Sequence, residues 1–432
     1  MTRQIGIIAD DLTGANDSGV QLAEKGISTS VFFETPTSET TIDRGIVIDT
    51  NSRALTRREA VEATKRAAAF IKQARYQQVY KKMDSTLRGH IGAELKAVGD
   101  ILDPDFIVVA PAYPKLGRTT VNGIHYVKGD KIANTEVSID PKHPVLESSI
   151  PAIIQNEIGE HAEVLTKEMI EASLSDFTLW INRMVEDGIK YIVCDANTQT
   201  DLFQAAKKIN SLSKDIVWAG SAGLAEVLPE VLEIDQLHDE TKKIGLSQVM
   251  TVCGSLSQVT QSQIVYAKKQ PNIQAVEIDT SAIFNDNWQR EQQQYIQQCT
   301  NALREEQDVV LFVPSNEEIR REVKQLADQL SLTPNQIGER ISSAIGEMVA
   351  QIAKRNEQLT GLVLTGGDTA KDTAKHLGGV GINLIKQVEA GIPLGTLIGT
   401  DKLYHVVTKA GSFGKLNSIY EAMQVLKGEE TK

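Results

Sequence analysis

The chain has 432 residues, enough for two or three domains that each have a hydrophobic core. Hydrophobic residues make up 41% and charged residues 24%, which is the balance of an ordinary globular protein. The net charge of -12 argues against a nucleic-acid surface, so no nucleic-acid partner is expected. No apolar run approaches the length of a membrane helix, so no membrane partner is expected either.

The cysteines, the histidines and the N-terminus bear on the compartment and on metal binding. Cys194, Cys253 and Cys299 are far apart and show no C-x-x-C spacing, so neither a disulfide framework nor a zinc site is expected. The histidines show no metal-ligand spacing, and no resident metal site is predicted. The first residues lead straight into an apolar strand, without the features of a signal peptide. These features together favour a cytoplasmic protein.

Strands and helices alternate through the first half. Strands are predicted at 4–9, 30–33, 45–49, 78–81 and 106–110, and helices at 18–25, 56–74 and 91–101. The alternation predicts a mostly parallel sheet with helices on both faces, in which ligands bind at the carboxyl ends of the strands. Three polar clusters fall at such ends: Asp10-Asp11, 51–53 and 81–89. Their coincidence predicts a binding site in this half.

Residues 111–145 are rich in proline and glycine and are predicted to form a loop region. They carry Arg118, Thr119, Thr120, Asn122 and His125. We expect this region to be either a lid or an extended hairpin beside the same pocket. Strands are then predicted again at 190–195 and 215–219.

A polar, charged stretch at 229–247 lacks apolar periodicity and is predicted to be a linker. It would join an N-terminal domain, 1–228, to a C-terminal domain, 248–432. In the second half, strands are predicted at 248–252, 272–278, 309–313, 361–365, 384–388 and 403–408, and helices at 287–306, 338–356 and 370–377. The predicted fold class is therefore α/β, with two α/β domains that each have a mostly parallel sheet flanked by helices.

Two adjacent carboxylates, Asp10 and Asp11, follow the first strand directly. Neighbouring side chains in extended chain point in different directions, so they are expected to have different tasks. One would accept a hydrogen bond from a substrate hydroxyl or take its proton, while the other caps the next helix or holds a cation. The alternative is that both are capping and turn residues.

Lys81, Lys82 and Arg88 place three positive charges within eight positions, with Asp84 among them. At most one of the two lysines is expected to face the ligand crevice, because neighbours alternate along a strand. An arginine can bind a carboxylate with two nitrogens, and Arg88 and Arg53 are both candidates. The mixture of cations, carboxylate and hydroxyls favours a polyhydroxy acid as ligand, and the alternative is a solvated basic turn.

Three glycine-rich turns follow strands in the second half, at 254–255, 366–369 and 409–414. Backbone N–H groups at such turns bind phosphate, and glycine lets the backbone approach the anion. The turns would converge on one nucleotide site if their strands are parallel neighbours, and otherwise they are ordinary tight turns. Lys409 either neutralises phosphate or is a surface lysine. Neither a P-loop nor a dinucleotide-binding motif is present.

Four motifs together resemble the four-carbon acid sugar kinases: Ile8–Ala15, Lys82–Gly89, Leu364–Ala370 and Thr408–Gly414. The resemblance covers essentially the whole chain, with the motifs in the right order. It implies that the N-terminal domain binds a sugar acid, that the C-terminal domain binds ATP, and that the product is a 4-phosphate. The sequences of residues 13–23 and 80–84 most resemble the branch of the family that acts on D-threonate, over those for D-erythronate, L-threonate or a 3-oxo acid.

Carried over by position, the resemblance assigns binding residues. It places the sugar acid near Asp11, Arg53, Lys81, Lys82, Met83 and Asp84. Arg88 is added to this group because of its positive charge. The resemblance places ATP near Ser255, Gly366, Gly367, Asp368, Thr369 and Gly411. Asp11 or Asp84 is the expected catalytic carboxylate, acting with ATP and Mg²⁺. A sugar-acid sensor without catalysis is the rival from another class. The sequence leaves the oligomeric state open, a homo-oligomer included.

Overall fold

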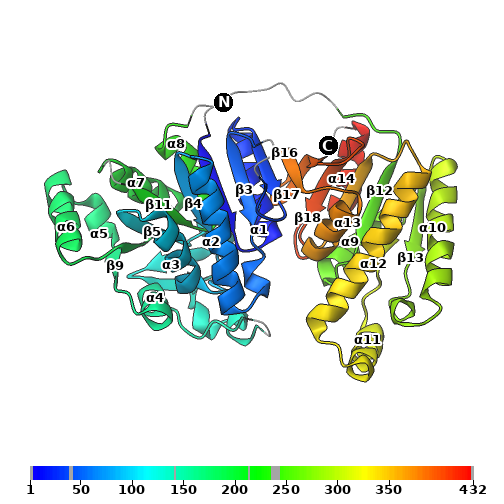
Figure 1. Cartoon of the computed structure of the whole chain (residues 1–432), viewed down its shortest axis with the longest axis horizontal. Coiled ribbons are helices and arrows are strands. Elements are labelled where there is room, and N and C mark those ends of the chain that lie inside the picture. The colour runs from blue at the N-terminus through cyan, green and yellow to red at the C-terminus, as the bar shows by residue number, and fades with distance from the viewer. Residues whose placement is uncertain (1–2, 38–41, 141–142, 213–214, 235–243, 430–432) are drawn as a thin grey trace. The chain divides into compact units, whose positions relative to one another are not determined.

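The computed structural model of the protein describes residues 3–37, 42–140, 143–212, 215–234 and 244–429. The chain divides into two compact units, Met1–His238 and Asp239–Lys432, and each is described by itself (Figure 1). Among the described residues, no helix combines the length and apolar character needed to cross a bilayer.

The described part of the N-terminal unit contains a sheet whose neighbouring strands are all parallel. Its spatial order is β2 (Thr29–Phe32), β3 (Gly45–Asp49), β1 (Ile5–Ala9), β4 (Gln78–Lys82), β11 (Ile216–Gly220), β5 (Phe106–Ala110), β10 (Tyr191–Cys194) and β9 (Ala162–Leu165). Every residue of β1, β3, β5 and β11 is buried, as expected for strands covered on both faces.

Helices cover this sheet in two groups, and contacts link the members of each group (Figure 1). One group holds α1 (Leu12–Glu24), α8 (Ala222–Val231) and α7 (Gln199–Asn210), and the other holds α2 (Arg57–Gln73), α3 (Ile91–Leu102) and α4 (Ile150–Ile158). The short α5 (Lys167–Glu171) and the longer α6 (Leu174–Glu186) lie between β9 and β10 in the sequence. Thr56 and Glu59 form a reciprocal capping box that starts α2, close to the predicted boundary.

The loop region between β5 and α4 forms a small antiparallel sheet. Its strands are β6 (Arg118–Val121), β7 (Ile124–Val127) and β8 (Asp130–Lys131). The extended hairpin is therefore the alternative that the structure adopts. The turn between β6 and β7 is held by Asp195, whose carboxylate accepts from the backbone N–H groups of Asn122 and Gly123 at 2.7 and 2.9 Å.

The C-terminal unit contains a mixed sheet within its described residues. Its order is β13 (Ile273–Glu277), β14 (Asp308–Phe312), β12 (Val249–Cys253), β15 (Gly361–Thr365), β18 (His405–Lys409), β17 (Ile392–Ile398) and β16 (Gly381–Glu389). In this spatial order, the neighbouring pairs β13–β14, β14–β12, β12–β15 and β15–β18 are parallel. Strand β17 is antiparallel to both of its partners in this unit. Its helices are α9 (Gln258–Ala267), α10 (Trp288–Arg304), α11 (Glu317–Leu330), α12 (Pro334–Arg355), α13 (Gly367–His376) and α14 (Ser418–Lys427).

Two α/β units with mostly parallel sheets confirm the predicted fold class, but several local predictions were wrong. Helix α1 begins at Leu12, not at residue 18, because the Asp11 carboxylate accepts from the Gly14 N–H at 2.9 Å and caps the helix. Strands β9 and β17 and helices α4, α6 and α14 were not predicted. Helix α8 continues to Val231 and so enters the stretch predicted as a linker, of which residues 235–243 lie outside the described residues.

Candidate functional site

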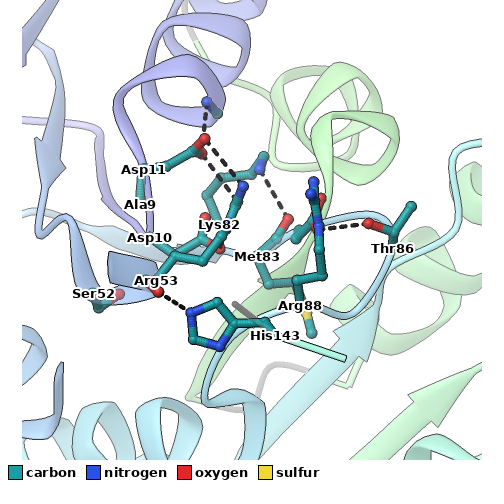
Figure 2. Close-up of polar contacts among 12 residues, drawn as sticks. Ala9, Asp10, Asp11, Ser52, Arg53, Lys82, Met83, Thr86, Arg88 and His143 are labelled. Carbon is teal, nitrogen blue, oxygen red and sulfur yellow. Dashed lines mark hydrogen bonds and ion pairs between the residues drawn. The ribbon is translucent and has the colours of Figure 1, made fainter. Parts of the chain in front are cut away.

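The carboxyl ends of β1, β3 and β4 lie at one level of the N-terminal sheet. The register pairs Ala9 with Asp49 on one side and with Lys82 on the other. The segments that leave these three strands therefore start next to one another. Figure 2 shows the result: Asp10 and Asp11, Arg53, Lys82 and Arg88 come from different segments and gather in one region.

Arg53 lies in the short 3-10 helix Ser52–Ala54 that follows β3, and its guanidinium is bound by both adjacent carboxylates. Its Nε and Nη2 donate to Asp10 Oδ2 at 3.0 and 2.7 Å. Its Nη1 and Nη2 donate to Asp11 Oδ2 and Oδ1, both at 3.1 Å. His143 donates Nε2–H to the Arg53 carbonyl (Figure 2). Most of the fork predicted to bind a substrate carboxylate is thus occupied within the protein.

The two carboxylates respond differently to this arrangement. Burial raises the pKa of Asp10, but Arg53 and the nearby lysines outweigh it, so its pKa lies below the ordinary value. Burial also raises the pKa of Asp11, and there Arg53 does not fully offset it, so the pKa of Asp11 lies above the ordinary value. The Asp11 side chain is 26% exposed and that of Asp10 is 3% exposed, so Asp11 is the carboxylate that a ligand can reach.

Lys81 and Lys82 are both buried and point to opposite sides of β4. Lys81 Nζ forms an ion pair with Glu94 Oε2 of α3 at 2.8 Å, and it lines a small cavity with Asp10, Met83, Ile91, Glu94 and Leu95. Lys82 Nζ donates to the Met83 carbonyl at 2.9 Å and lies against Gly14 of α1, where an added Cβ would be 2.5 Å from it. The alternation predicted from the sequence is present, and Glu94 had not been assigned a role.

Asp84 and Arg88 form the third part of the cluster. Asp84 Oδ2 accepts from Thr86 Oγ1 at 2.6 Å and from Arg88 Nε at 2.5 Å, and Arg88 Nη1 donates to Asp140 Oδ2 at 3.3 Å. Burial raises the pKa of Asp84, but the charges of Arg53 and Arg88, together with its hydrogen bonds, lower it by more than burial raises it. The pKa of Asp84 therefore lies well below the ordinary value. Asp84 is therefore ionised at neutral pH and suited to accept hydrogen bonds.

Asp17 of α1 is a site residue to which sequence reasoning gave no role. Its Oδ1 is buried without a hydrogen-bond partner among the described residues. Burial raises its pKa to about 7, while the charge of Lys82 lowers it and that of Asp11 raises it. The sequence analysis placed residue 17 before the predicted helix, whereas the structure places it in the second turn of α1.

In the C-terminal unit, the three glycine turns do converge. Parallel β12, β15 and β18 are neighbours, and their register pairs Cys253 with Thr365 and Thr365 with Lys409. The turns at 254–255, 366–369 and 410–414 therefore start at the same level. The sequence predicted that the turns would converge if their strands were parallel neighbours, and these three strands are parallel neighbours.

The turns approach one another so closely that side chains would collide. A Cβ on Gly254 would lie 2.0 Å from Thr369 Oγ1, and one on Gly411 would lie 2.2 Å from Ser255 Oγ. Gly366 has a φ of 101°, a conformation that favours glycine. The result is a narrow space bordered by backbone, with Ser255, Gly366, Thr369 and Gly411 brought together.

Helix α13 presents its N-terminus to this space. Its first intrahelical bond runs from Ala370 N–H to the Gly366 carbonyl at 2.9 Å, so the N–H groups of residues 367–369 precede the helical ladder. Asp368, in the first turn, is exposed. These groups and the positive end of the helix dipole suit a phosphate.

Lys409 is buried, so the surface alternative for this lysine is wrong. Its Nζ donates to the carbonyls of Ala410, Gly411 and Phe413 and to Thr260 Oγ1, at 2.8, 3.3, 3.0 and 3.2 Å. Burial lowers the pKa of Lys409 to about 8. The ammonium group thereby shapes the turn that carries Gly411.

Comparison with known proteins gives each unit a family. The family model "Sugar-binding N-terminal domain" matches residues 5–228, and "Nucleotide-binding C-terminal domain" matches residues 250–419. The two matches define a protein with a sugar-binding half and a nucleotide-binding half. The chain belongs to the four-carbon acid sugar kinase family, which confirms the resemblance predicted from the four motifs.

The relatives are similar over their full length. The chain is 32% identical to the D-threonate kinase of Salmonella typhimurium, with 98% of both chains covered. It is 28% identical to the D-erythronate kinase of Heliobacterium modesticaldum, covering 94% of this chain and 93% of that one. A solved structure described as a putative tRNA synthase from Salmonella typhimurium has a TM-score of 0.82 at 22% identity, covering 98% of this chain and 99% of that chain, and it bears on the fold alone.

Proposed function

We propose that this protein is an ATP-dependent kinase that phosphorylates the 4-hydroxyl of a four-carbon sugar acid, D-threonate, to give D-threonate 4-phosphate. One observation carries the proposal. The half that matches a sugar-binding domain holds the buried cluster of cations and carboxylates, and the half that matches a nucleotide-binding domain holds the glycine turns. The similarity to a D-threonate kinase over 98% of both chains supports the choice of substrate.

In the proposed reaction, the terminal hydroxyl of the sugar acid attacks the γ-phosphorus of ATP, and the bond to the bridging oxygen of ADP breaks. Asp84, held ionised by the nearby guanidinium groups, accepts a hydrogen bond from a substrate hydroxyl. Asp11, whose pKa is raised, is the better acceptor for the proton that the attacking hydroxyl loses. Phosphoryl transfer depends mainly on positioning and charge stabilisation, so neither carboxylate has to be a strong base.

The residues of the glycine turns fit a nucleoside triphosphate. The N–H groups of residues 367–369 and the close backbone approach at Gly254 and Gly411 form a cradle that side chains would fill. Among the described residues, no group of three His, Cys, Asp or Glu side chains is arranged to hold a metal. Mg²⁺ is commonly held by one or two carboxylates and the phosphates themselves, so Asp368 is the proposed protein contact. When bound, Mg²⁺ would neutralise charge on the phosphates.

Two alternatives stay open. The same reaction on D-erythronate, L-threonate or a 3-oxo acid differs by one stereocentre or oxidation state, and the relatives include a D-erythronate kinase. A sugar-acid sensor without catalysis is the alternative from another class, and the complete glycine cradle argues against it. Because ATP is a cytoplasmic substrate and the cysteines of the described residues are unbridged, we propose a cytoplasmic location.

The test is ADP release coupled to a reporter reaction, with D-threonate, D-erythronate, L-threonate and a 3-oxo acid, each with and without Mg²⁺. Mg²⁺-dependent turnover that is highest on D-threonate supports the whole proposal. Highest turnover on another acid keeps the kinase and rejects D-threonate. Binding of a sugar acid in calorimetry without ADP release from any of them rejects the kinase and favours the sensor.

A further inference from the structure

The arginines of the N-terminal site differ in whether a carboxylate neutralises them. Arg53 is bound by Asp10 and Asp11, and Arg88 is bound by Asp84 and Asp140. Arg118, in β6 of the hairpin, has no ion pair and no side-chain hydrogen bond within the described residues, and its Nε is buried without a partner. A buried guanidinium nitrogen without an acceptor is costly, so this group needs an anion from elsewhere.

The backbone fixes where Arg118 lies. Its N–H donates to the Tyr113 carbonyl at 3.2 Å and its carbonyl accepts from the Tyr113 N–H at 2.8 Å. The register of β6 with β7 places it opposite Val127. Arg118 therefore lies on a strand that is paired on both sides, so the backbone from which its side chain extends is held in place.

The contacts of Thr120 indicate which face of β6 carries the Arg118 side chain. Thr120 and His125 are a cross-strand pair, and the Thr120 hydroxyl donates to His125 Nδ1 at 3.0 Å. His125 Nε2–H in turn donates to the Ser85 carbonyl at 2.9 Å. Residues two apart in a strand share a face, so Arg118 stands on the same face as Thr120, the face against the segment that carries Asp84.

The charges that act on Arg118 agree with this placement. Burial lowers the pKa of the Arg118 guanidinium, Asp84 raises it and Arg88 lowers it. Asp84 is already bound through Oδ2 by Thr86 and Arg88, and it forms no ion pair within 4.0 Å with Arg118. Arg118 therefore borders the proposed substrate site with its charge largely unmatched.

We propose that Arg118 binds the carboxylate of the sugar acid and so makes the enzyme select acids over neutral polyols. This inference rests on the proposed function, because it assumes a sugar acid at this site. A planar guanidinium can donate two parallel N–H bonds to one carboxylate, which fixes the acid end of the ligand. Arg53 and Arg88, occupied by protein carboxylates, would then shape the site without being the main partner of the acid group.

The experiment compares D-threonate with D-threonamide, which has the same carbon chain but a neutral carboxamide. For the wild type and Arg118→Gln, kcat and KM are measured on both compounds, and binding of D-threonate is measured by calorimetry. We expect Arg118→Gln to raise the KM for D-threonate at least tenfold, and on the order of 50-fold. Turnover of D-threonamide and the KM for ATP should change less than threefold, because neither depends on a carboxylate contact.

Matched variants separate binding from folding. Lys131→Gln removes a positive charge from an exposed position of the same hairpin and should leave both substrates unaffected. Arg118→Lys keeps the charge, so it should fold even if Arg118→Gln does not, and it should raise the KM for D-threonate at least fivefold while sparing D-threonamide.

Three outcomes overturn the inference. They are an unchanged KM for D-threonate in Arg118→Gln, an equal loss on D-threonate and D-threonamide, and a loss of discrimination in Arg53→Gln but not in the Arg118 variants. If the wild type binds D-threonate but releases no ADP, the proposed function fails. Calorimetry with D-threonate and D-threonamide still decides the role of Arg118 in that case.

Discussion

Arg53 and Asp10 are joined by two hydrogen bonds in the N-terminal site, with Arg53 Nε and Nη2 both donating to Asp10 Oδ2 at 3.0 and 2.7 Å. The pair joins the segment that follows β3 to the end of β1. The Asp10 side chain is only 3% exposed, so its charge depends on this partner. The same pair that shapes the site therefore also contributes to the stability of the unit.

Replacing Arg53 should destabilise the N-terminal unit. Arg53→Gln leaves the buried Asp10 carboxylate without its partner, and breaking a buried pair in this way costs about 3 kcal/mol. The measurement is urea unfolding of the full chain followed by tryptophan fluorescence, to which the buried Trp218 of β11 contributes. Arg58→Gln, at an exposed position of α2, is the control and should change the free energy of unfolding little. Equal stability of the two variants would contradict the assigned pairing.

The two sites should respond separately to mutation. Arg53→Ala should weaken sugar-acid binding at least tenfold and leave ATP binding intact, because it disrupts only the cluster in the N-terminal unit. Asp368→Ala should do the reverse, since it lies in the first turn of α13. Calorimetry with each ligand, at a temperature where both variants are folded, checks this. If either variant weakens both ligands equally, the assignment of one ligand to each unit is rejected.

The glycine cradle should not tolerate a methyl group. Gly254→Ala would place its Cβ 2.0 Å from Thr369 Oγ1, so the turns must separate. We expect ATP binding to fall at least tenfold while sugar-acid binding is kept. Gly338→Ala is the matched control, because no atom lies within 4 Å of its Cβ and alanine favours the helix. Normal ATP affinity in Gly254→Ala would show that the turns do not hold the nucleotide.

His125 should make stability depend on pH. Burial lowers its pKa from 6.5 to about 4, with Arg118 lowering it and Asp84 raising it as the nearby charges. Between these two values the unfolded chain binds more protons than the folded chain, so stability rises with pH and is lost as the pH falls. From pH 6.5 to 5, this loss amounts to about 2 kcal/mol.

A comparison with His125→Gln isolates this contribution. Glutamine can also donate to the Ser85 carbonyl and accept from Thr120, but it does not titrate. The difference in unfolding free energy between wild type and variant should shrink or change sign as the pH is lowered from 7 to 5. His161→Gln, at an exposed position beside Glu163, should leave the pH dependence of the wild type unchanged. A pH-independent difference for His125→Gln would contradict a buried neutral histidine.

Much of the site could be predicted because strand ends are visible in a sequence. The runs 4–9 and 45–49 are short and mostly apolar, 78–81 is a further short strand segment, and the polar residues at the ends of the three fall at the same edge of any parallel sheet. The pairing of charges was not predictable in the same way. The sequence shows Arg53 and Arg88 as equal candidates for a carboxylate, but their partners Asp10, Asp11 and Asp140 are up to 52 positions away.

The sequence alone determined the alternation of strands and helices, the family, and the residue types available at each strand end, because hydrophobic periodicity and local motifs are written in neighbouring residues. Only the tertiary structure decided which charges neutralise one another. It buried Lys81 against Glu94, occupied Arg53 with two carboxylates, and left the Arg118 guanidinium without an ion-pair partner among the described residues. Such pairings depend on distances across the sheet, which long-range packing sets and local sequence does not.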